Sequence, residues 1–211
     1  MTVGLPSPAP GTTRLILLRH GEPDETVHGR CYGRLDPGLS PRGTRQMQHT
    51  WSQLDGQPAA AIYSSPRRRA VESAGLRRTD TPAICVDDGL REVDFGEFEG
   101  LTYGDIALRY PDSYAEWMNR PTAVTFPGGE SFAEMAVRVR DALDRIRQRH
   151  AGETVAIVSH GGVNRIALAA ALELDSHRIF RLAQAYACIN VIDYLGDEPV
   201  VCLVNGTFES C

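Results

Sequence analysis

The stretch RLILLRHGE at residues 14–22 decides the fold, because a short apolar run ends there in charged residues and a glycine. A run of this length and composition predicts a buried β-strand, which RHG (19–21) follows. A second apolar run, TVAIVS at residues 154–159, ends in the same way in HGG (160–162). Two buried strands that each end in a histidine and a glycine predict a shared site at one edge of a sheet.

Helical and strand-like stretches alternate along the rest of the chain. Ser40-Pro41 and Ser65-Pro66 each predict an N-cap followed by proline in the first turn of a helix. Ser131 and Glu134 form a capping box, and the apolar stripe behind them predicts a helix over residues 131–149. Expected strands lie at residues 14–19, 60–63, 83–86, 154–159, 187–195 and 199–204, with further helices at 103–109, 114–119 and 163–172.

This alternation predicts an α/β fold of three layers, in which a mostly parallel central sheet carries helices on both faces. The last two strands are joined by Gly196-Asp197, which predicts a closing hairpin and one antiparallel strand. Residues 1–13 are interpreted as a flexible tail and residues 14–211 as one domain. The irregular stretch 88–130 is interpreted as a cap-like insertion between the third strand and the long helix.

Composition argues against several classes of function. The 211 residues carry a net charge of −5, so there is no general basic field for nucleic acid. No apolar run approaches the ~20 residues that a membrane span needs, and the N-terminus lacks the features of a signal peptide. The five cysteines are irregularly spaced without a CxxC, which favours reduced thiols in a cytoplasmic protein. The six histidines form no HxH or HxxxH pair, so no metal and no other cofactor is expected.

Three strand ends carry the residues that point to chemistry, namely RHGE (19–22), SSPRRRA (64–70) and SHGG (159–162). Ligands in open α/β sheets bind at the carboxyl ends of the strands. Arginine is the usual bidentate partner of phosphate, and histidine can act as a nucleophile toward phosphorus. Helix N-termini behind the second and fourth strands add free N–H groups. The sequence therefore predicts a phosphoryl site in which arginines replace a metal ion.

A leaving alkoxide also needs a proton, and the loop LREVDFGEFEG (90–100) offers carboxyl groups for that purpose. A general acid must hold a proton near neutral pH, which partial burial beside an anion favours. Glu92 and Asp94 are both candidates for this role. The remaining charged residues near the motifs are expected on solvated faces, and these are Arg67, Arg68, Glu97 and Glu99.

Six segments, in this order, resemble the histidine phosphatase superfamily, in the branch that contains cofactor-dependent phosphoglycerate mutase, fructose-2,6-bisphosphatase and the α-ribazole phosphatases. They are LLRHGE (17–22), GRLDPGLSPRG (33–43), IYSSPRRRA (62–70), LREVDFGEFEGLT (90–102), PGGESFAEMAVRV (127–139) and VAIVSHGG (155–162). The combination is specific, whereas a lone RHG would be weak. The DFGEFEG and PGGES segments look most like the α-ribazole phosphatase and broad-specificity phosphatase group. The resemblance implies a phosphoglycerate mutase-like fold.

The resemblance also implies roles for single residues. His20 would become a phosphohistidine through Nε2, Glu92 would donate the proton, and Arg19, Arg69 and His160 would act on the phosphoryl group. Further phosphate or substrate contacts are implied for Gly21, Thr26, Arg30, Gly33, Arg34 and Gly161. Many relatives have an asparagine six residues after the histidine, where this chain has Thr26, so a phosphate contact and an ordinary loop role both stay open for Thr26.

The expected function is metal-independent hydrolysis of a small phosphate monoester, with α-ribazole 5′-phosphate and phosphosugars as candidate substrates. Phosphoryl transfer of the mutase type is an alternative, although the enclosing extensions of a mutase are not visible after the last strand. A non-catalytic sensor of phosphorylated ligands is a third hypothesis, and loss of the nucleophile or of an arginine would mark it. The expected partner is a small phosphorylated metabolite, a homodimer stays open, and neither nucleic acid nor a membrane is expected.

Overall fold

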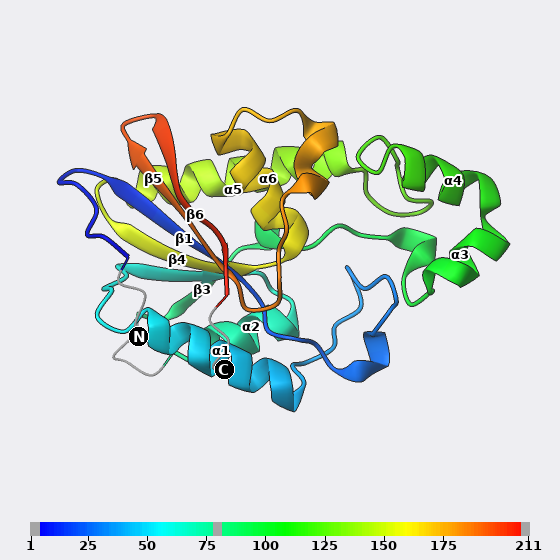
Figure 1. The fold of residues 1–211 in the computed structure, drawn as a ribbon, viewed down its shortest axis with the longest axis horizontal. Helices are drawn as coiled ribbons and strands as arrows, with labels where there is room; N and C mark the ends of the chain where they lie inside the picture. Colours follow the sequence, from blue (N-terminus) through cyan, green and yellow to red (C-terminus); the bar gives the residue numbers. More distant parts are fainter. Residues whose placement is uncertain (1–4, 78–81, 208–211) are drawn as a thin grey trace.

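The computed structural model describes residues 5–77 and 82–207, and a six-stranded sheet forms their centre (Figure 1). The strand order is β3-β2-β4-β1-β5-β6. The strands are β1 (Thr13–Arg19), β2 (Ala61–Ser64), β3 (Ile84–Val86), β4 (Thr154–Ser159), β5 (Ile189–Leu195) and β6 (Glu198–Gly206). The first four strands pair in parallel, whereas β5 runs antiparallel to both β1 and β6. The mostly parallel sheet and the closing hairpin predicted from the sequence are confirmed.

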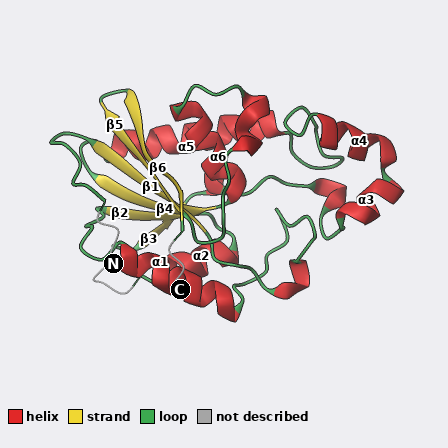
Figure 2. Cartoon of the chain, in the orientation of Figure 1, coloured by secondary structure: helices red, strands yellow, loops and turns green. Residues whose placement is uncertain are grey.

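Helices cover both faces of this sheet, as Figures 1 and 2 show. On one face α1 (Pro41–Gln53) and α2 (Arg68–Gly75) pack with Ile16 and Leu18 of β1. On the other face α5 (Phe132–Arg149) and α6 (Gly161–Ala171) pack with Leu15 and Leu17. Successive side chains of a strand point to opposite faces, so a continuous apolar run is required when both faces are covered. The three-layer α/β fold is therefore confirmed.

Two of the predicted helix caps, at Ser40 and Ser131, are confirmed, and the third, at Ser65, is not. The Ser40 hydroxyl accepts from the Gly43 amide at 2.9 Å, and Ser131 and Glu134 make both bonds of their capping box. These bonds satisfy amide groups that have no partner inside a helix. The cap expected at Ser65 is wrong, because α2 begins at Arg68 and has no side-chain cap. The Ser65 hydroxyl is instead directed to the site described below.

Residues 88–130 extend beyond the end of the sheet and carry α3 (Tyr103–Arg109) and α4 (Pro111–Asn119) (Figure 1). Their aromatic side chains pack on one another, with ring centroids 4.9 Å apart for Phe95 and Phe126 and 5.3 Å apart for Trp117 and Phe126. The same cluster continues into the core under α5. This segment therefore forms an aromatic wall at the end of the molecule that the strand ends face.

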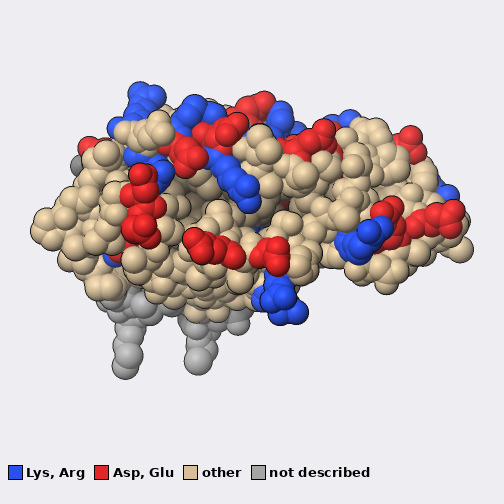
Figure 3. Space-filling model, turned by 90° about the horizontal axis from the view of Figure 1, so that it is seen from above, with Lys and Arg blue, Asp and Glu red and all other residues tan. Residues whose placement is uncertain are grey.

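The surface and the N-terminal segment complete the description. Side chains of both charges are mixed over the face seen in Figure 3, which is hollowed near its middle. Arg14 of β1 donates to the Pro6 carbonyl and to the Asp193 carboxylate, so part of the expected tail contacts the domain. Residues 1–4 of that expected tail lie outside the described residues. Within the described part of the chain, no helix is long and apolar enough to cross a membrane.

Candidate active site

His20 follows β1 directly and lies where three strand ends meet. Its amide donates to the Ser159 carbonyl at 3.0 Å, so β4 fixes its backbone. Its side chain is 2% exposed, and Nδ1 lies 2.7 Å from the Gly21 carbonyl oxygen. A carbonyl can only accept, so Nδ1 carries the proton. In the neutral ring Nε2 then keeps a lone pair, which is the requirement for a nucleophile.

His160 follows β4, and its ring lies beside that of His20 with 5.2 Å between centroids. Its Nε2 lies 2.8 Å from the hydroxyl of Ser65, which follows β2. Both histidines are buried. Sequence reasoning missed Ser65, because a serine before proline is the ordinary signature of a helix cap. The pairing register places residues 19 and 159 side by side, so the predicted convergence of the two histidines is seen.

Electrostatic surroundings keep both imidazoles neutral. Burial lowers the pKa of His20 well below its ordinary value, and the guanidinium groups of Arg69 and Arg19 lower it further. Burial also lowers the pKa of His160, again with a contribution from Arg69. The two rings are therefore uncharged near neutral pH, and the positive charge of the site resides on its arginines.

Arg19 is held between a carbonyl and an aromatic ring. Its Nη1 donates to the Gln184 carbonyl, and its guanidinium lies 4.1 Å from the ring centroid of Tyr186. The side-chain oxygen of Gln184 accepts from Asn164 at 3.0 Å and from Asn190 at 2.9 Å, which anchors the segment that positions Arg19. No sequence pattern predicted this buried amide network, because its members come from α6, from β5 (Ile189–Leu195) and from the loop between them.

Arg69 is fully buried and binds the loop that follows Arg30. Its Nη1 donates to the Leu35 carbonyl at 2.9 Å, and Nη2 donates to the Tyr32 carbonyl at 3.1 Å. The same loop is held from its other side by Glu99, whose carboxylate accepts from the amides of Gly33, Arg34 and Leu35 at 2.6–3.0 Å. The solvated face expected for Glu99 is therefore wrong.

Four polar atoms around the two histidines are buried without a hydrogen-bond partner. Among the described residues seven buried side-chain atoms lack a partner, and four of them are Nε of Arg19, Arg67 and Arg69 and Nδ1 of His160. Arg67, expected on a solvated face, is instead half-buried. Leaving a buried donor unpaired costs about 1–3 kcal/mol, so such atoms are rare away from sites of function. An oxyanion with several acceptor oxygens matches this set of donors.

A cavity of about 220 Å³ opens beside His20 and Arg19. Glu92 lines it, and its carboxylate accepts from the Gly162 amide at 3.2 Å, at the N-terminus of α6. A side chain at position 162 would overlap the Glu92 carboxylate, so only glycine permits this approach. Aromatic side chains form much of the remaining wall, and these are Phe95, Tyr103, Trp117, Phe132 and Phe180.

Of the other predicted contact residues, Arg30 lines the cavity, whereas Thr26 and Asp94 do not. Arg30 lines the cavity but is exposed and donates to the Gly100 carbonyl. Thr26 is exposed, and its hydroxyl donates to Asp24 at 2.7 Å, outside the cavity lining. Asp94, the second acid candidate, accepts from the Gly96 amide and pairs with Arg34 at 3.8 Å, also outside that lining. The structure therefore brings Glu92, and not Asp94, to the histidines.

Gly21 and Gly33, two of the predicted glycines, lie at close backbone approaches, whereas Gly161 lies beside arginine side chains. Gly21 packs against Gly43 of α1, Gly33 packs against the Val93 carbonyl, and Gly161 is the first residue of α6. No group of three or more His, Cys, Asp or Glu side chains that could hold a metal ion occurs in residues 5–77 and 82–207. The guanidinium groups of Arg19 and Arg69, which act on His20, offer positive charge to an anion in this site.

Two features of the cavity were not predicted. The hydroxyl oxygens of Tyr32 and Tyr186 lie 2.8 Å apart, and the Tyr32 ring lies beside Arg69 and the Tyr186 ring beside Arg19. Arg165 of α6 lines the cavity, donates from Nε to the Leu182 carbonyl at 2.9 Å, and lies over the Phe180 ring. None of these three residues belongs to a recognisable motif, so only the folded chain reveals them.

Comparison with known proteins gives the same picture. A bifunctional protein of Mycobacterium tuberculosis is 39% identical over 198 residues, which cover 92% of this chain and 54% of that protein. The chain thus spans about half the length of this relative. Phosphoserine phosphatase 1 of Hydrogenobacter thermophilus is 32% identical over 198 residues, with 92% of each chain covered.

Solved structures and family models agree with these relatives. The α-ribazole phosphatase of Shigella flexneri has a TM-score of 0.84 at 26% identity, covering 92% of this chain and 96% of that one. The model of the histidine phosphatase superfamily (branch 1) matches residues 15–207, which include every motif quoted for the resemblance. The chain therefore belongs to branch 1 of the histidine phosphatase superfamily.

Proposed function

We propose that the protein hydrolyses small phosphate monoesters by passing the phosphoryl group from substrate to Nε2 of His20 and then to water. The observation that carries this proposal is the set of partnerless buried donors around His20. Nε of Arg19, Nε of Arg69 and Nδ1 of His160 would each gain a partner from a phosphoryl oxygen. Stabilising charge on the transferring group is the main catalytic requirement of phosphoryl transfer.

In the first step the Nε2 lone pair forms a bond to phosphorus while the bond from phosphorus to the leaving oxygen breaks. Glu92 gives its proton to that oxygen, so the alcohol leaves neutral. In the second step water attacks the phosphohistidine and Glu92 takes a proton from it. The phosphorus–nitrogen bond breaks, its electron pair returns to Nε2, and inorganic phosphate is released.

The leaving group would occupy the cavity beyond Glu92. Its aromatic wall suits an apolar or ring-shaped face, which supports a nucleoside-like or sugar phosphate such as α-ribazole 5′-phosphate. A relative acts on phosphoserine by its name, so phosphoserine is a competing substrate. The free thiols of the described chain favour a cytoplasmic location for this activity.

Arg165 supports a further property of the substrate. Arg165 lies in the cavity lining and forms no ion pair within the described residues. Burial lowers the pKa of its guanidinium, and the charge of Glu92 opposes that shift. A guanidinium in a cavity is a good partner for a carboxylate or a second phosphate. A substrate with a second anionic group, such as phosphoserine, would therefore gain a contact that α-ribazole 5′-phosphate cannot make.

The test is phosphate release from a panel of monoesters in EDTA. The panel contains α-ribazole 5′-phosphate, phosphosugars, phosphoserine, and the pair 3-phosphoglycerate and glycerol 3-phosphate, which differ only by a carboxylate in place of a hydroxymethyl group. At least one monoester should release phosphate at a rate that EDTA leaves unchanged. Arg165→Gln should lower kcat/KM for 3-phosphoglycerate about tenfold more than for glycerol 3-phosphate.

Other outcomes would redirect the proposal. Activity that EDTA removes and Mg²⁺ restores would contradict metal independence. Fast formation of 2-phosphoglycerate with negligible phosphate release would favour the mutase alternative. Binding of phosphorylated ligands without any turnover would favour the sensor hypothesis. If Arg165→Gln lowers kcat/KM equally for 3-phosphoglycerate and for glycerol 3-phosphate, Arg165 does not recognise a second anion.

A further inference from the structure

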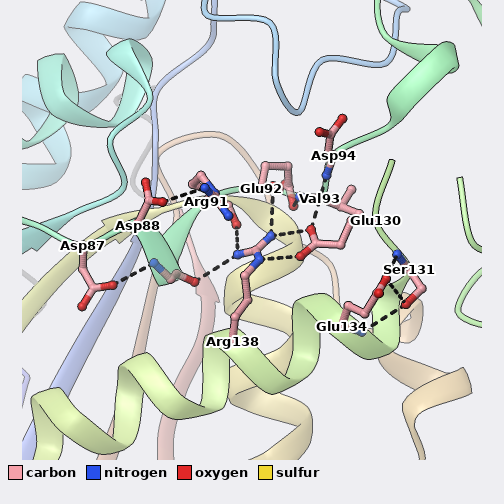
Figure 4. A network of polar contacts seen from close by, with 11 residues as sticks. Asp87, Asp88, Arg91, Glu92, Val93, Asp94, Glu130, Ser131, Glu134 and Arg138 are labelled. Carbon is pink, nitrogen blue, oxygen red and sulfur yellow. Dashed lines mark hydrogen bonds and ion pairs between the residues drawn. The ribbon is translucent and has the colours of Figure 1, made fainter. Parts of the chain in front are cut away.

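Arg138 of α5 and Glu130 form a two-pronged ion pair below the segment that carries Glu92 (Figure 4). Arg138 Nε donates to Glu130 Oε1 at 2.6 Å, and Nη2 donates to Oε2 at 2.7 Å. The two side chains are 18% and 17% exposed, so water screens the pair only weakly. Parallel bonds of this kind fix the plane of the guanidinium as well as its position.

The remaining N–H groups of Arg138 are directed to the backbone of residues 89–92. Nη1 donates to the Gly89 carbonyl at 3.0 Å and to the Arg91 carbonyl at 2.7 Å, and Nη2 donates to the Glu92 carbonyl at 3.1 Å. A side chain at Gly89 would meet Ala142 of α5, so glycine lets this segment approach the helix. One arginine therefore holds three carbonyls, including that of Glu92 (Figure 4).

Glu130 holds the segment on the other side of Glu92. Its amide donates to the Asp94 carbonyl at 2.9 Å, and its carboxylate accepts from the Asp94 amide at 3.4 Å. Residues 91–95 belong to no strand or helix, since they lie between two 3₁₀ turns, Asp88–Leu90 and Gly96–Phe98. No neighbouring strand fixes this backbone, so contacts such as these, together with the bond from the Phe95 amide to the Glu99 carboxylate at 3.1 Å, hold its position.

We infer that Arg138 and Glu130 are positioning residues for proton transfer, which hold the Glu92 carboxyl at the cavity beside His20. The inference rests on the proposed function, because it assigns the proton donor to Glu92. A displacement of about 1 Å in a reacting group can cost on the order of 10²-fold in rate. Neither Arg138 nor Glu130 lines the cavity, so both act through Glu92 and not on the substrate.

The test compares leaving groups that do and do not need a proton. The variants are Arg138→Lys, which keeps the charge but loses the fork, and Glu130→Gln, which keeps the shape but loses the charge. The substrates are p-nitrophenyl phosphate and the best alkyl monoester of the panel. Arg145→Gln is the matched control, because Arg145 also lies on α5 and contacts Asp87, at 3.3 Å and farther along the helix.

Both variants should lower kcat/KM for the alkyl monoester about tenfold, while p-nitrophenyl phosphate changes by less than about a factor of two. Melting temperatures identify any variant that is not folded, and the second variant then decides. In a Glu92→Gln background, Arg138→Lys should cause no further loss on the alkyl monoester. The control variant should leave both substrates unchanged.

Three results would overturn the inference. Equal losses on both substrates would mean a general structural role. A full additional loss in the Glu92→Gln background would mean that Arg138 acts independently of Glu92. An active wild type with selective losses for Glu92→Gln, but none for either variant, would remove the positioning role alone. A wild type that hydrolyses no monoester would instead end the proposed function, and this inference with it.

Discussion

The two histidines of this site and Glu92, its proposed acid, are held in place in different ways. His20 and His160 follow adjacent parallel strands, and their positions are set by the pairing register of β1 and β4. Glu92 lies in a segment without regular structure, which Arg138 and Glu130 hold through side-chain bonds. The comparison teaches that sheet hydrogen bonding places the proposed nucleophile, whereas a few long-range side-chain contacts place the proposed acid.

The strongest test of this contrast removes the proposed nucleophile. His20→Ala should lower turnover by roughly 10⁴ or more and abolish the acid-labile phosphoenzyme, because the proposed mechanism forms its covalent intermediate on this ring. Phosphoenzyme is trapped by rapid alkaline quenching after mixing with labelled substrate. His177→Ala, at an exposed histidine outside the site, is the control. Near-normal turnover in His20→Ala would remove the covalent mechanism.

Removal of the acid should have a smaller effect that depends on the leaving group. Glu92→Gln should lower kcat for an alkyl monoester by roughly 10²–10⁴, since the leaving alkoxide then departs without a proton. Hydrolysis of p-nitrophenyl phosphate should fall much less, because phenolate leaves unaided. Steady-state kinetics on both substrates measures the difference. Equal losses of kcat on both substrates would mean that Glu92 has a structural role. Asp94→Asn would then test the second candidate acid.

A comparison of Ser65→Ala with Ser64→Ala tests how His160 is oriented. Ser65→Ala removes the side-chain hydroxyl that contacts His160 Nε2 at 2.8 Å, and kcat/KM should fall about tenfold because the ring is then less well oriented. Ser64→Ala is a matched control one residue earlier, since the Ser64 hydroxyl donates to the Ser65 carbonyl and contacts neither histidine. If the two variants behave alike, the His160 contact has no specific role.

The smallest expected effect is a dependence of the free energy of unfolding on pH. Folding lowers the pKa of His20 and His160 from the ordinary 6.5, so the unfolded chain binds protons more readily. Their contribution to the free energy of unfolding is fully present above pH 6.5 and is lost as pH falls below it toward the folded values. Chemical denaturation of the free protein at pH 7 and pH 5 measures this loss.

A bound anion should reverse part of the lowering of the pKa of His20. Inorganic phosphate would compensate the charges of Arg19 and Arg69, which lower the pKa of His20. Binding should therefore raise the pKa of that ring and take up protons. Calorimetric titration with phosphate, in buffers of different ionisation enthalpy, measures the uptake. Binding without proton uptake would show that the arginines do not control the charge of the imidazoles.

Local sequence signals predicted the fold and half of the site. Apolar runs identified the strands, and caps at Ser40 and Ser131 identified helix starts, because these features depend on neighbours in the chain. The 3₁₀ stretch Ser176–Arg181 was not predicted, since it has no comparable signal. The convergence of His20 and His160 followed from strand polarity alone.

The contacts that sequence reasoning missed are those between residues far apart in the chain. The serine at position 65 has the signature of a cap, yet its hydroxyl is directed to a histidine 95 residues later. Glu99 has the composition of a solvated loop, but it binds amides more than 60 residues earlier. Side-chain direction of this kind is fixed by packing, and no pattern of neighbouring residues encodes it.

The way in which Arg19 and Arg69 are held has a consequence for the binding of the phosphate product. Both guanidinium groups bind backbone carbonyls, and in the described chain neither forms an ion pair with a carboxylate. Under the proposed function, the released phosphate would meet the same two guanidinium groups as the substrate does. We therefore expect inorganic phosphate to inhibit the proposed hydrolysis, so that turnover would fall as free phosphate accumulates.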